Sequence, residues 1–546
     1  MTDAIGAAAS SGFETFSPRD RARALVAAAD ALDAAADELV PLAQAETGLA
    51  EGRLRGELKR TTVQLRLFAS VAAAGEFLDV RIDDADPDFV LGPRPDLRRF
   101  RVPLGPVLNF AASNFPFAFS VMGGDTASAL AAGCPVVVKA HPGHPKLSDR
   151  TAEIARAAIA KAGLPADALT VIHGQEEGVA ALRDPRITAA AFTGSVAGGR
   201  ALARIAAERE HPIPFYGELG SINPVVVTPA ALAERADQIA AGFAASVTGS
   251  AGQLCTKPGL LFVPSPTPPA DDPAATDSAS DSSATVGSPS DSSAGGGLAG
   301  GGLAGGGLAG GGLAGGGLAG GGLAGGGLAG GGFAALAAGA FEAAGKHRLL
   351  HRGIADGYGR RRDEVLGTPG VTVVVTGEVD DLDASPTLVE TDLATLAEHR
   401  DTLLDEAFGP LSLVVRYDPG APLAAELAGL VEGSLAAGVH TGSGEDSPWL
   451  RELVTVLSDR SGRLLFNGWP TGVAVTPAQQ HGGPWPATTN PTTTSVGTAA
   501  IDRFLRPVTY QDCPPELLPE PLRDDNPWNV PQHRSPAGES SHWGEV

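Results

Sequence analysis

Hydrophobic and polar positions alternate along the chain in two patterns, which predict helices and buried strands in turn. Between residues 18 and 74 the apolar positions recur at helical spacing, with Ser17 as the N-cap, Pro18 at the first helical position and a predicted break at Pro41. From residue 135 onward, short apolar runs alternate with amphipathic segments, which is typical of a parallel sheet covered by helices on both faces. The predicted strands are 99–104, 107–110, 135–139, 169–173, 187–193, 215–219, 223–228, 260–263, 371–376, 411–416 and 463–467. The other predicted helices are 119–132, 147–162, 176–182, 195–208, 229–248, 335–360, 393–404, 422–437 and 448–459. The pattern indicates an α/β fold of nucleotide-binding type.

One stretch, residues 264–334, departs from this pattern. It starts rich in Pro, Ser, Asp and Ala, continues as seven GGGLA repeats from Gly295, and ends in the variant GGGFA at 330–334. Such a chain has too little side-chain surface to compensate its ordering entropy. We therefore predict a disordered, flexible insertion; the alternative is a glycine solenoid with a five-residue period. The Pro-rich tail from residue 513 is predicted to be extended.

Charge and cysteine content narrow the class of protein. The 546 residues carry a net charge of −23, which argues against nonspecific binding to nucleic acid or to anionic membranes. The N-terminus lacks the pattern of a signal peptide, and no apolar run is long enough to span a bilayer. Cys134, Cys255 and Cys513 form neither a disulfide framework nor a zinc pattern. We expect a cytoplasmic protein with free thiols and no metal.

Three residues at the ends of predicted elements, or in the loops between them, are of a catalytic type. Asn114 lies between a predicted strand and a helix, Glu218 ends a strand among apolar neighbours, and Cys255 follows a long helix in a loop of small residues. A partly desolvated carboxylate can act as a general base and a thiol as a nucleophile. Taken singly, each has an ordinary alternative: a turn or helix cap, an edge carboxylate, and a buried inert cysteine.

Other residues lie at positions where α/β folds bind anions. Lys139 ends an apolar strand at the sheet edge where α/β folds bind ligands. Gly194 and Ser195 stand between a strand and a helix, where free backbone N–H groups can hold phosphate. The alternatives are a solvated strand end for Lys139 and a simple N-cap for Ser195. His141 and His144 are better explained by a Pro/Gly turn than by a metal site.

Taken together, and in their order along the chain, the segments that contain Asn114, Lys139, Ser195, Glu218 and Cys255 resemble the aldehyde dehydrogenase superfamily. Residues 405–410, Asp-Glu-Ala-Phe-Gly-Pro, resemble the family's E-x-F-G-P motif. A narrower likeness, to the 2,5-dioxovalerate (α-ketoglutarate semialdehyde) dehydrogenase branch, is carried by residues 217–224, 252–258, 480–488, 494–498 and 503–508. Gly220-Ser221 departs from the superfamily's Gly-Gly but is usual in this branch, and Ser113 stands where Trp is usual.

The resemblance implies an aldehyde dehydrogenase-like architecture: a Rossmann-type cofactor domain, an α/β catalytic domain and an oligomerisation arm, assembled as a homodimer or homotetramer. We divide the chain accordingly into a cofactor-binding domain with a helical N-terminus (1–229), a catalytic domain (230–263 and 335–440), the insertion (264–334), a C-terminal return with the arm (441–512) and the tail (513–546).

The resemblance also implies the chemistry, which is NAD(P)-dependent oxidation of an aldehyde to a carboxylic acid. Cys255 is expected to attack the aldehyde, the Asn114 amide and the Cys255 N–H to hold the oxyanion of the thiohemiacetal, and Glu218 to activate water against the thioester. The residues expected to bind the cofactor are Lys139 (adenosine ribose), Gly194 and Ser195 (pyrophosphate), Glu406 (nicotinamide ribose) and Phe408.

The narrower likeness favours NADP over NAD as the cofactor and 2,5-dioxopentanoate as the substrate, with 2-oxoglutarate as the product. Aliphatic, fatty and aromatic aldehydes remain alternatives, as do transfer of the acyl group to coenzyme A and a catalytically silent, cofactor-binding relative. Phe115, Phe117 and Trp485 are candidates for an apolar substrate channel, or else core residues. No arginine can be chosen from the sequence to bind a substrate carboxylate.

Overall fold

A computed structural model describes residues 2–266 and 332–544. The prediction of a flexible insertion lies outside the described residues, apart from its two ends. No helix in the two described ranges is long and apolar enough to cross a membrane.

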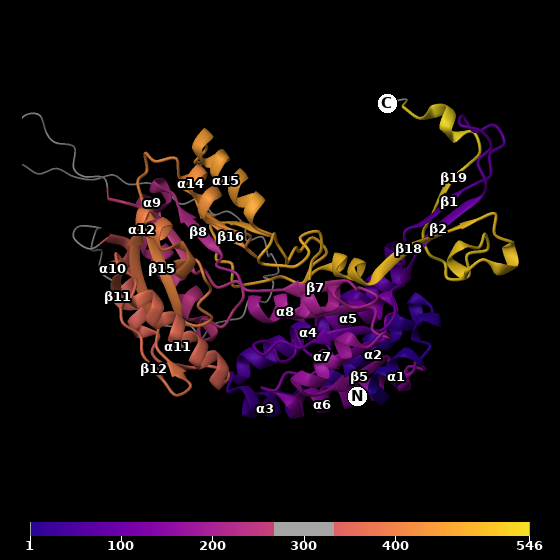
Figure 1. Cartoon of the computed structure of the whole chain (residues 1–546), viewed down its shortest axis with the longest axis horizontal. Helices are drawn as coiled ribbons and strands as arrows, with labels where there is room; N and C mark the ends of the chain where they lie inside the picture. The colour runs from indigo at the N-terminus through magenta and orange to yellow at the C-terminus, as the bar shows by residue number, and fades with distance from the viewer. Residues whose placement is uncertain (1, 267–331, 545–546) are drawn as a thin grey trace, which may run out of the picture.

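A five-stranded parallel sheet forms the first layer, in the order β5-β4-β3-β6-β7. Its apolar strands are buried on both faces, because helices cover each side (Figure 1). The strands are β3 (Val107–Phe110), β4 (Val136–Lys139), β5 (Leu169–Ile172), β6 (Ala189–Thr193) and β7 (Phe215–Glu218). The interleaved helices are α5 (Gly124–Ala132), α6 (Pro145–Lys161), α7 (Gln175–Arg183) and α8 (Val196–Ala207). This confirms the predicted Rossmann-type layer.

The helical N-terminus packs on both faces of this sheet. It comprises α1 (Thr2–Ala9), α2 (Pro18–Ala34), α3 (Ala36–Thr47) and α4 (Glu51–Ala74). Helix α1 lies on the face that α7 and α8 cover, and α2, α3 and α4 lie on the opposite face. Ser17 caps α2 as predicted, in a capping box with Asp20. The break predicted at Pro41 is wrong: the helices separate at Ala35, and Pro41 lies inside α3. The lost backbone hydrogen bond is tolerated there because neighbouring Leu39, Val40 and Ala43 are buried.

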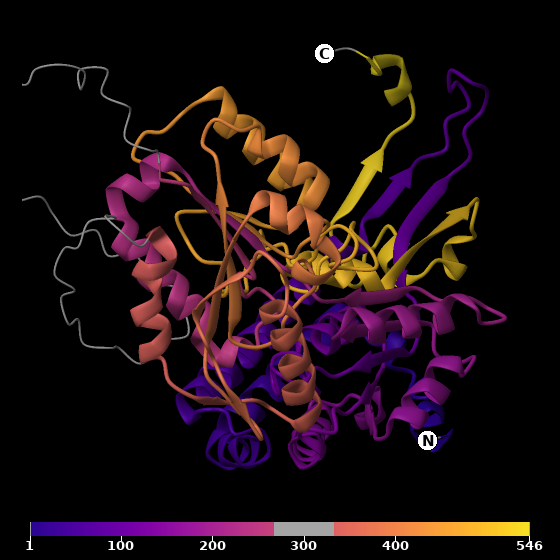
Figure 2. The ribbon, with the colours of Figure 1, turned by 60° about the vertical axis from the view of Figure 1, so that its left-hand side comes forward.

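A second, seven-stranded sheet follows in the order β11-β14-β15-β9-β8-β16-β17. Alternate residues of its strands face α9 and α10 on one side and α11, α12, α14 and α15 on the other (Figure 2). The strands are β8 (Pro224–Val227), β9 (Leu260–Pro264), β11 (Thr372–Val375), β14 (Thr387–Asp392), β15 (Leu411–Tyr417), β16 (Ala437–His440) and β17 (Leu464–Phe466). The helices are α9 (Pro229–Thr248), α10 (Gly332–Ala343), α11 (Arg352–Leu366), α12 (Leu393–Glu398), α13 (Arg400–Leu403), α14 (Leu423–Leu430) and α15 (Pro448–Arg460). A small sheet of β10 (His347–Arg348), β13 (Asp383–Ala384) and β12 (Val379–Asp380) lies beside α11.

Three predicted helices in this part are wrong in extent. The segment 393–404 divides at His399 into α12 and α13. The segment 335–360 forms two helices, because Gly345 adopts a left-handed φ of 69° and β10 follows it. The segment 422–437 is helical only to Leu430, and β16 begins where a helix was predicted to end. All four β16 residues are buried, so their continuous apolar pattern fits a central strand as well as a helix.

A four-stranded sheet, in the order β18-β2-β1-β19, forms an arm that projects from the body (Figures 1 and 2). Its strands are β1 (Val80–Asp83), β2 (Leu97–Pro103), β18 (Leu505–Gln511) and β19 (Gln532–Ser535). Three of them were not predicted: β18 and β19 are largely exposed, and β1 alternates apolar and polar residues over only four positions. The tail is not simply extended: β19 pairs with β1, and Leu522 and Val530 are buried against the arm.

The sheets divide the chain at different points from the predicted boundaries. Strand β8 pairs with β9 and β16, so the chain enters the seven-stranded sheet at Pro224, ahead of residue 229. Strands β1 and β2 belong to the arm although they precede the five-stranded sheet. The functions assigned to these domains stay a prediction.

Candidate active site

Three ionisable side chains from distant parts of the chain meet between the two large sheets. Glu218 is the last residue of β7, Cys255 lies in the loop between α9 and β9, and His481 belongs to the C-terminal return. One ligand-type atom from each lies within 4.8 Å of the others. The structure therefore brings together Cys255 and Glu218 as the sequence predicted, and adds a histidine to which the sequence gave no role.

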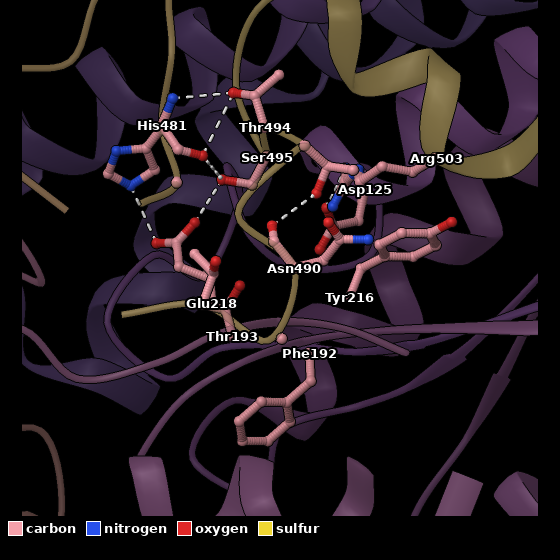
Figure 3. Close-up of a pocket in the computed structure, with 14 residues that line it drawn as sticks. Asp125, Phe192, Thr193, Tyr216, Glu218, His481, Asn490, Thr494, Ser495 and Arg503 are labelled. Carbon is pink, nitrogen blue, oxygen red and sulfur yellow. Dashed lines mark hydrogen bonds and ion pairs between the residues drawn. The ribbon is translucent and has the colours of Figure 1, made fainter. Parts of the chain in front are cut away.

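His481 contacts both of the predicted catalytic groups through one ring nitrogen. Its Nε2 lies 3.0 Å from Glu218 Oε1 and 3.7 Å from Cys255 Sγ. The Ser495 hydroxyl donates to the other carboxylate oxygen, Glu218 Oε2 (Figure 3). Behind this group, the buried ion pair between Arg503 and Asp125, 2.7 Å long, joins the C-terminal return to α5.

The electrostatics of the site favour a protonated Cys255 thiol next to an ionised Glu218 carboxylate. Burial raises the pKa of the Cys255 thiol well above its usual range, and the negative charges of Glu218 and Glu406 add to this effect. Burial also acts to raise the pKa of Glu218, but His481, Ser495 and Cys255 outweigh it and lower that pKa overall. At neutral pH the pair is therefore a neutral thiol next to an ionised carboxylate, which is the arrangement that a general base requires.

The loop that carries Cys255 is held in an unusual backbone conformation. Ser250, Ala251 and Gly252 have left-handed φ values of 54°, 55° and 65°. The Asn223 side chain fixes the following turn, because its amide donates to the carbonyl oxygens of Cys255 and Lys257 at 2.8 and 3.0 Å. Non-glycine residues in this region cost about 1–3 kcal/mol each, so the surrounding contacts must hold the loop in place.

Asn114 lies next to the same loop. Its Nδ2 donates to the carbonyl oxygen of Gln253 at 3.0 Å, which leaves one of the two amide hydrogens for another partner. The backbone N–H of Cys255 donates to no residue in the described ranges. Two N–H donors of the kind that hold an oxyanion thus flank the thiol.

The predicted cofactor-binding residues stand at the carboxyl edge of the five-stranded sheet. Lys139 ends β4, where burial lowers its pKa, and it forms no ion pair with any residue that the structure describes. Gly194 and Ser195 follow β6 and are exposed, and Ser195 caps α8 by accepting from the Gly198 N–H at 3.2 Å. The edge thus offers an unpaired cation and an open helix N-terminus, which suit the ribose and phosphates of a dinucleotide.

Glu406 approaches the site from the segment before β15, and Phe408, two residues further on, is half-buried. A Cβ on Gly220 would lie 2.5 Å from Glu406 Oε2, so the glycine leaves room for this carboxylate. Burial raises the pKa of Glu406 and lowers that of neighbouring Lys257. Lys257 donates to the Leu411 carbonyl at 2.6 Å, and the buried ammonium stands beside the carboxyl group. The charge of Glu406 reaches Cys255, which places the two predicted subsites next to each other.

Two residues of the site were missed from the sequence. His481 and Ser495 lie in segments that carry the narrower family likeness, but their contact with Glu218 spans 263 and 277 residues. A polar His-Gly-Gly run in an otherwise loop-like segment was the available signal.

Fold and site together define an NAD(P)-dependent aldehyde-oxidising enzyme, and residues 2–297 match the model of the aldehyde dehydrogenase family, to which the chain belongs. Among curated relatives, alpha-ketoglutaric semialdehyde dehydrogenase 2 of Azospirillum brasilense is 43% identical over 526 residues, covering 94% of this chain and 88% of the relative. Alpha-ketoglutaric semialdehyde dehydrogenase of Acinetobacter baylyi is 37% identical over 496 residues, covering 90% and 82%.

Solved structures share the fold at lower identity. Aldehyde dehydrogenase 21 of Physcomitrella patens, in complex with the reaction product succinate, matches with a TM-score of 0.67 and 18% identity, covering 93% of this chain and 89% of the other. The 3,6-anhydro-L-galactose dehydrogenase in complex with NAP matches with a TM-score of 0.67 and 19% identity, covering 93% and 90%.

Proposed function

We propose that this enzyme oxidises 2,5-dioxopentanoate to 2-oxoglutarate, with Cys255 as the nucleophile. The observation that supports the chemistry most directly is the contact of Cys255, His481 and Glu218 through atoms within 4.8 Å of one another. The substrate is supported by the two relatives named for α-ketoglutaric semialdehyde, which align with most of this chain.

In the first step, the Cys255 sulfur forms a bond to the aldehyde carbon while the thiol proton moves to Glu218. Glu218 can take this role because its lowered pKa keeps the carboxylate ionised beside the thiol. The raised pKa of Cys255 disfavours a free thiolate, so the proton leaves the sulfur as the C–S bond forms. His481 holds the carboxylate through Nε2 and lies within 3.7 Å of the sulfur. We assign it a positioning role between the two groups.

The electron pair of the carbonyl bond moves to the aldehyde oxygen. The free amide hydrogen of Asn114 and the backbone N–H of Cys255 are the donors that stabilise this oxyanion. One oxyanion donor typically contributes a factor of about 100 to 1,000 in kcat.

NAD or NADP, when bound, supplies a hydride acceptor for the aldehyde carbon. Lys139, Gly194, Ser195, Glu406 and Phe408 are the residues that we propose to hold it. The acyl group is then a thioester on Cys255. Glu218 first releases the thiol proton to solvent, then takes a proton from the water that attacks the thioester carbon and returns it to the departing sulfur, which gives the carboxylic acid and the free thiol. We propose NADP as the preferred cofactor, because Lys139 is a cation without an ion-pair partner in the described residues.

We further propose a homodimer or homotetramer assembled through the arm, whose outer strand β18 has mostly exposed residues. An open strand edge is a surface that pairs readily with another chain. A cytoplasmic, reducing setting is part of the proposal, because Cys255 must stay a free thiol. Light scattering on the purified protein gives the oligomeric state.

The test is a panel of aldehydes assayed with both cofactors by the absorbance of the reduced nicotinamide. We expect 2,5-dioxopentanoate to give the highest kcat/KM, and Cys255→Ala to lose all turnover. Cys513→Ala is the matched control, because it removes a thiol outside the site and should keep full activity. Full activity in Cys255→Ala would rule out the mechanism; equal rates with pentanal or benzaldehyde would rule out the substrate.

A further inference from the structure

One face of α4 carries three ionisable side chains beside the segment that holds Asn114. Arg53, Glu57 and Arg60 are spaced by four and three residues, which aligns them along the helix. Glu57 accepts from the N–H groups of Phe117 and Ala118 at 2.8 and 3.0 Å. These contacts tie α4 to the wall of the active site.

Glu57 and one terminal nitrogen of Arg53 are engaged by this wall, whereas Nε and Nη1 of Arg53 have no hydrogen-bond partner among the described residues. Arg53 donates to the Asn114 carbonyl oxygen at 2.5 Å, and Glu57 holds the turn that follows Asn114. Burial raises the pKa of Glu57, and the neighbouring arginines and two backbone N–H groups oppose this effect. Two guanidinium groups face this one carboxyl group, so this face carries an excess of positive charge even when Glu57 is ionised.

Arg60 has no hydrogen bond or ion pair with any side chain or backbone group in residues 2–266 and 332–544, and its Nε is buried without a partner. Its guanidinium carbon lies 5.7 Å from the ring centre of Phe115 and 5.2 Å from that of Phe119. Its charge acts on both Cys255 and Glu218, so it lies close to the reacting group. A buried charge without a partner is costly, which makes this side chain a receptor for an anion.

Arg463 is the other arginine whose charge reaches Cys255, and it is already engaged. Its two terminal nitrogens donate to the carbonyl oxygens of Gly472 and Pro470 at 2.6 and 2.5 Å. These bonds hold the loop that supplies Val473 and Val475 to the apolar cluster around Phe119. Arg463 therefore supports the wall of the site, whereas Arg60 has free donors.

Two aromatic rings connect Arg60 to the catalytic group. Phe115 and Phe119 pack against each other with ring centres 5.4 Å apart and planes tilted by 59°, and the Phe119 ring centre lies 6.4 Å from that of His481. The two other aromatic candidates from the sequence lie elsewhere: Phe117 is buried in the core, and Trp485 is half-exposed against Arg200. The apolar surface thus runs from the catalytic group to the unpaired guanidinium.

We propose that Arg60 binds the carboxylate of the substrate and selects short aldehydes that end in a carboxylate. The carbon chain lies against Phe115 and Phe119 while the aldehyde carbon reaches Cys255. A guanidinium matches a carboxylate with two parallel hydrogen bonds, which a neutral aldehyde cannot form. This inference rests on the oxo-acid substrate proposed above.

The experiment compares two five-carbon aldehydes, 2,5-dioxopentanoate and pentanal, in wild-type enzyme and in Arg60→Gln. We expect kcat/KM for the dioxo acid to fall about 10- to 100-fold in the variant, mainly through KM. The value for pentanal should change less than about threefold, because that substrate offers no anion. Inhibition by the proposed product, the dianion 2-oxoglutarate, should weaken in parallel.

Arg55→Gln is the matched control, since Arg55 lies on the same helix but points to solvent and pairs with Glu51 and Asp37. Circular dichroism checks the folding of each variant, and Arg60→Lys, which keeps a charge, should restore part of the loss if the glutamine variant misfolds. Equal losses of kcat/KM for both substrates, with a shifted pH profile, would show that the charge of Arg60 acts on the pKa of the Cys255 thiol. That result would overturn the proposal. An unchanged preference for the dioxo acid in Arg60→Gln would overturn the role proposed for Arg60, and the proposed substrate would stand. A wild-type enzyme that prefers pentanal would overturn the substrate itself.

Discussion

Glu218 is the residue whose protonation controls the proposed reaction, and His481 controls Glu218. The imidazole lies 3.0 Å from the carboxylate and helps to lower its pKa against the opposing effect of burial. The carboxylate must be ionised both to accept the thiol proton and to activate water. A change at His481 should therefore alter the pH dependence of turnover as well as its rate.

We expect His481→Gln to lower kcat by about tenfold or more and to move the acid limb of the kcat profile to higher pH. The sign follows from the lost partner: the pKa of Glu218 rises, so the ionised base disappears at a higher pH as the solution is acidified. The measurement is kcat from about pH 3.5 to about pH 8 with saturating aldehyde and cofactor, because the lowered pKa of Glu218 places the wild-type acid limb below the ordinary value of a glutamate. Ser495→Ala removes a hydrogen bond to the same carboxylate and should move the limb in the same direction. A lower kcat with an unmoved acid limb would contradict the proposed link between His481 and Glu218.

The chemical residues were predictable because each stands in a local pattern that has its own physical reason. Glu218 ends an apolar strand, and Cys255 follows a long helix in a loop of small residues. His481 and Arg60 were not predictable in the same way. One lies in a loop 263 residues from its carboxylate, and the other is one of several arginines on an amphipathic helix. Only the folded chain distinguishes Arg60 from Arg55, since their burial and partners differ rather than their spacing.

At the level of elements, the site depends on how the Cys255 loop fits against the segment before β15. A Cβ on Gly252 would lie 2.3 Å from the carbonyl oxygen of Gly409 and 2.7 Å from the nitrogen of Pro410. The two stretches that resemble family motifs, 252–258 and 405–410, are thus in direct backbone contact. Their spacing in the sequence gave no sign of this contact.

We expect Gly252→Ala to destabilise the protein by about 2 kcal/mol or more and to remove most activity, because alanine is strained at a φ of 65° and its methyl group meets backbone. Thermal unfolding and kcat/KM measure the two effects. Gly249→Ala is the control, because its added carbon meets nothing within 4 Å and its φ of −53° suits any residue. Equal stability of the two variants would show that the loop adapts to the methyl group.

The bounds of a predicted element are accurate where particular residues mark its two ends. Strand β3 and helix α9 were predicted to the residue, since turn-forming residues or a proline mark their ends. Strand β16 was missed because Leu435 to Val439 is continuously apolar and fits either structure. The arm strands β18 and β19 are largely exposed, so they lack the apolar pattern that identifies a strand.

At the level of the whole molecule, the described residues on either side of the insertion lie away from the candidate active site. Cys255 precedes the amino end of β9, whereas the insertion follows its carboxyl end at Pro264 and rejoins the fold at α10. Helix α10 packs on α9 on the outer face of the seven-stranded sheet. Cys255 and the insertion are thus connected to opposite ends of β9.

We expect replacement of residues 267–331 by a short Gly/Ser linker to leave kcat/KM within about twofold of wild type, since the cost of loop closure changes only logarithmically with length. Steady-state kinetics and thermal unfolding provide the measurement. A large loss of turnover in a variant that melts at the wild-type temperature would instead give the insertion a role in catalysis.

The dependence of Glu218 on the C-terminal return also sets when the enzyme can become active during its synthesis. The carboxylate precedes His481 by 263 residues, so roughly 13 to 50 s of translation separate them at ordinary elongation rates of about 5–20 residues per second. Until the return emerges from the ribosome, the nascent chain holds its thiol and its base without the imidazole and hydroxyl that organise them. A chain released early would therefore keep the cofactor sheet yet lack an assembled reaction centre, so translation itself delays the chemistry until the arm can form.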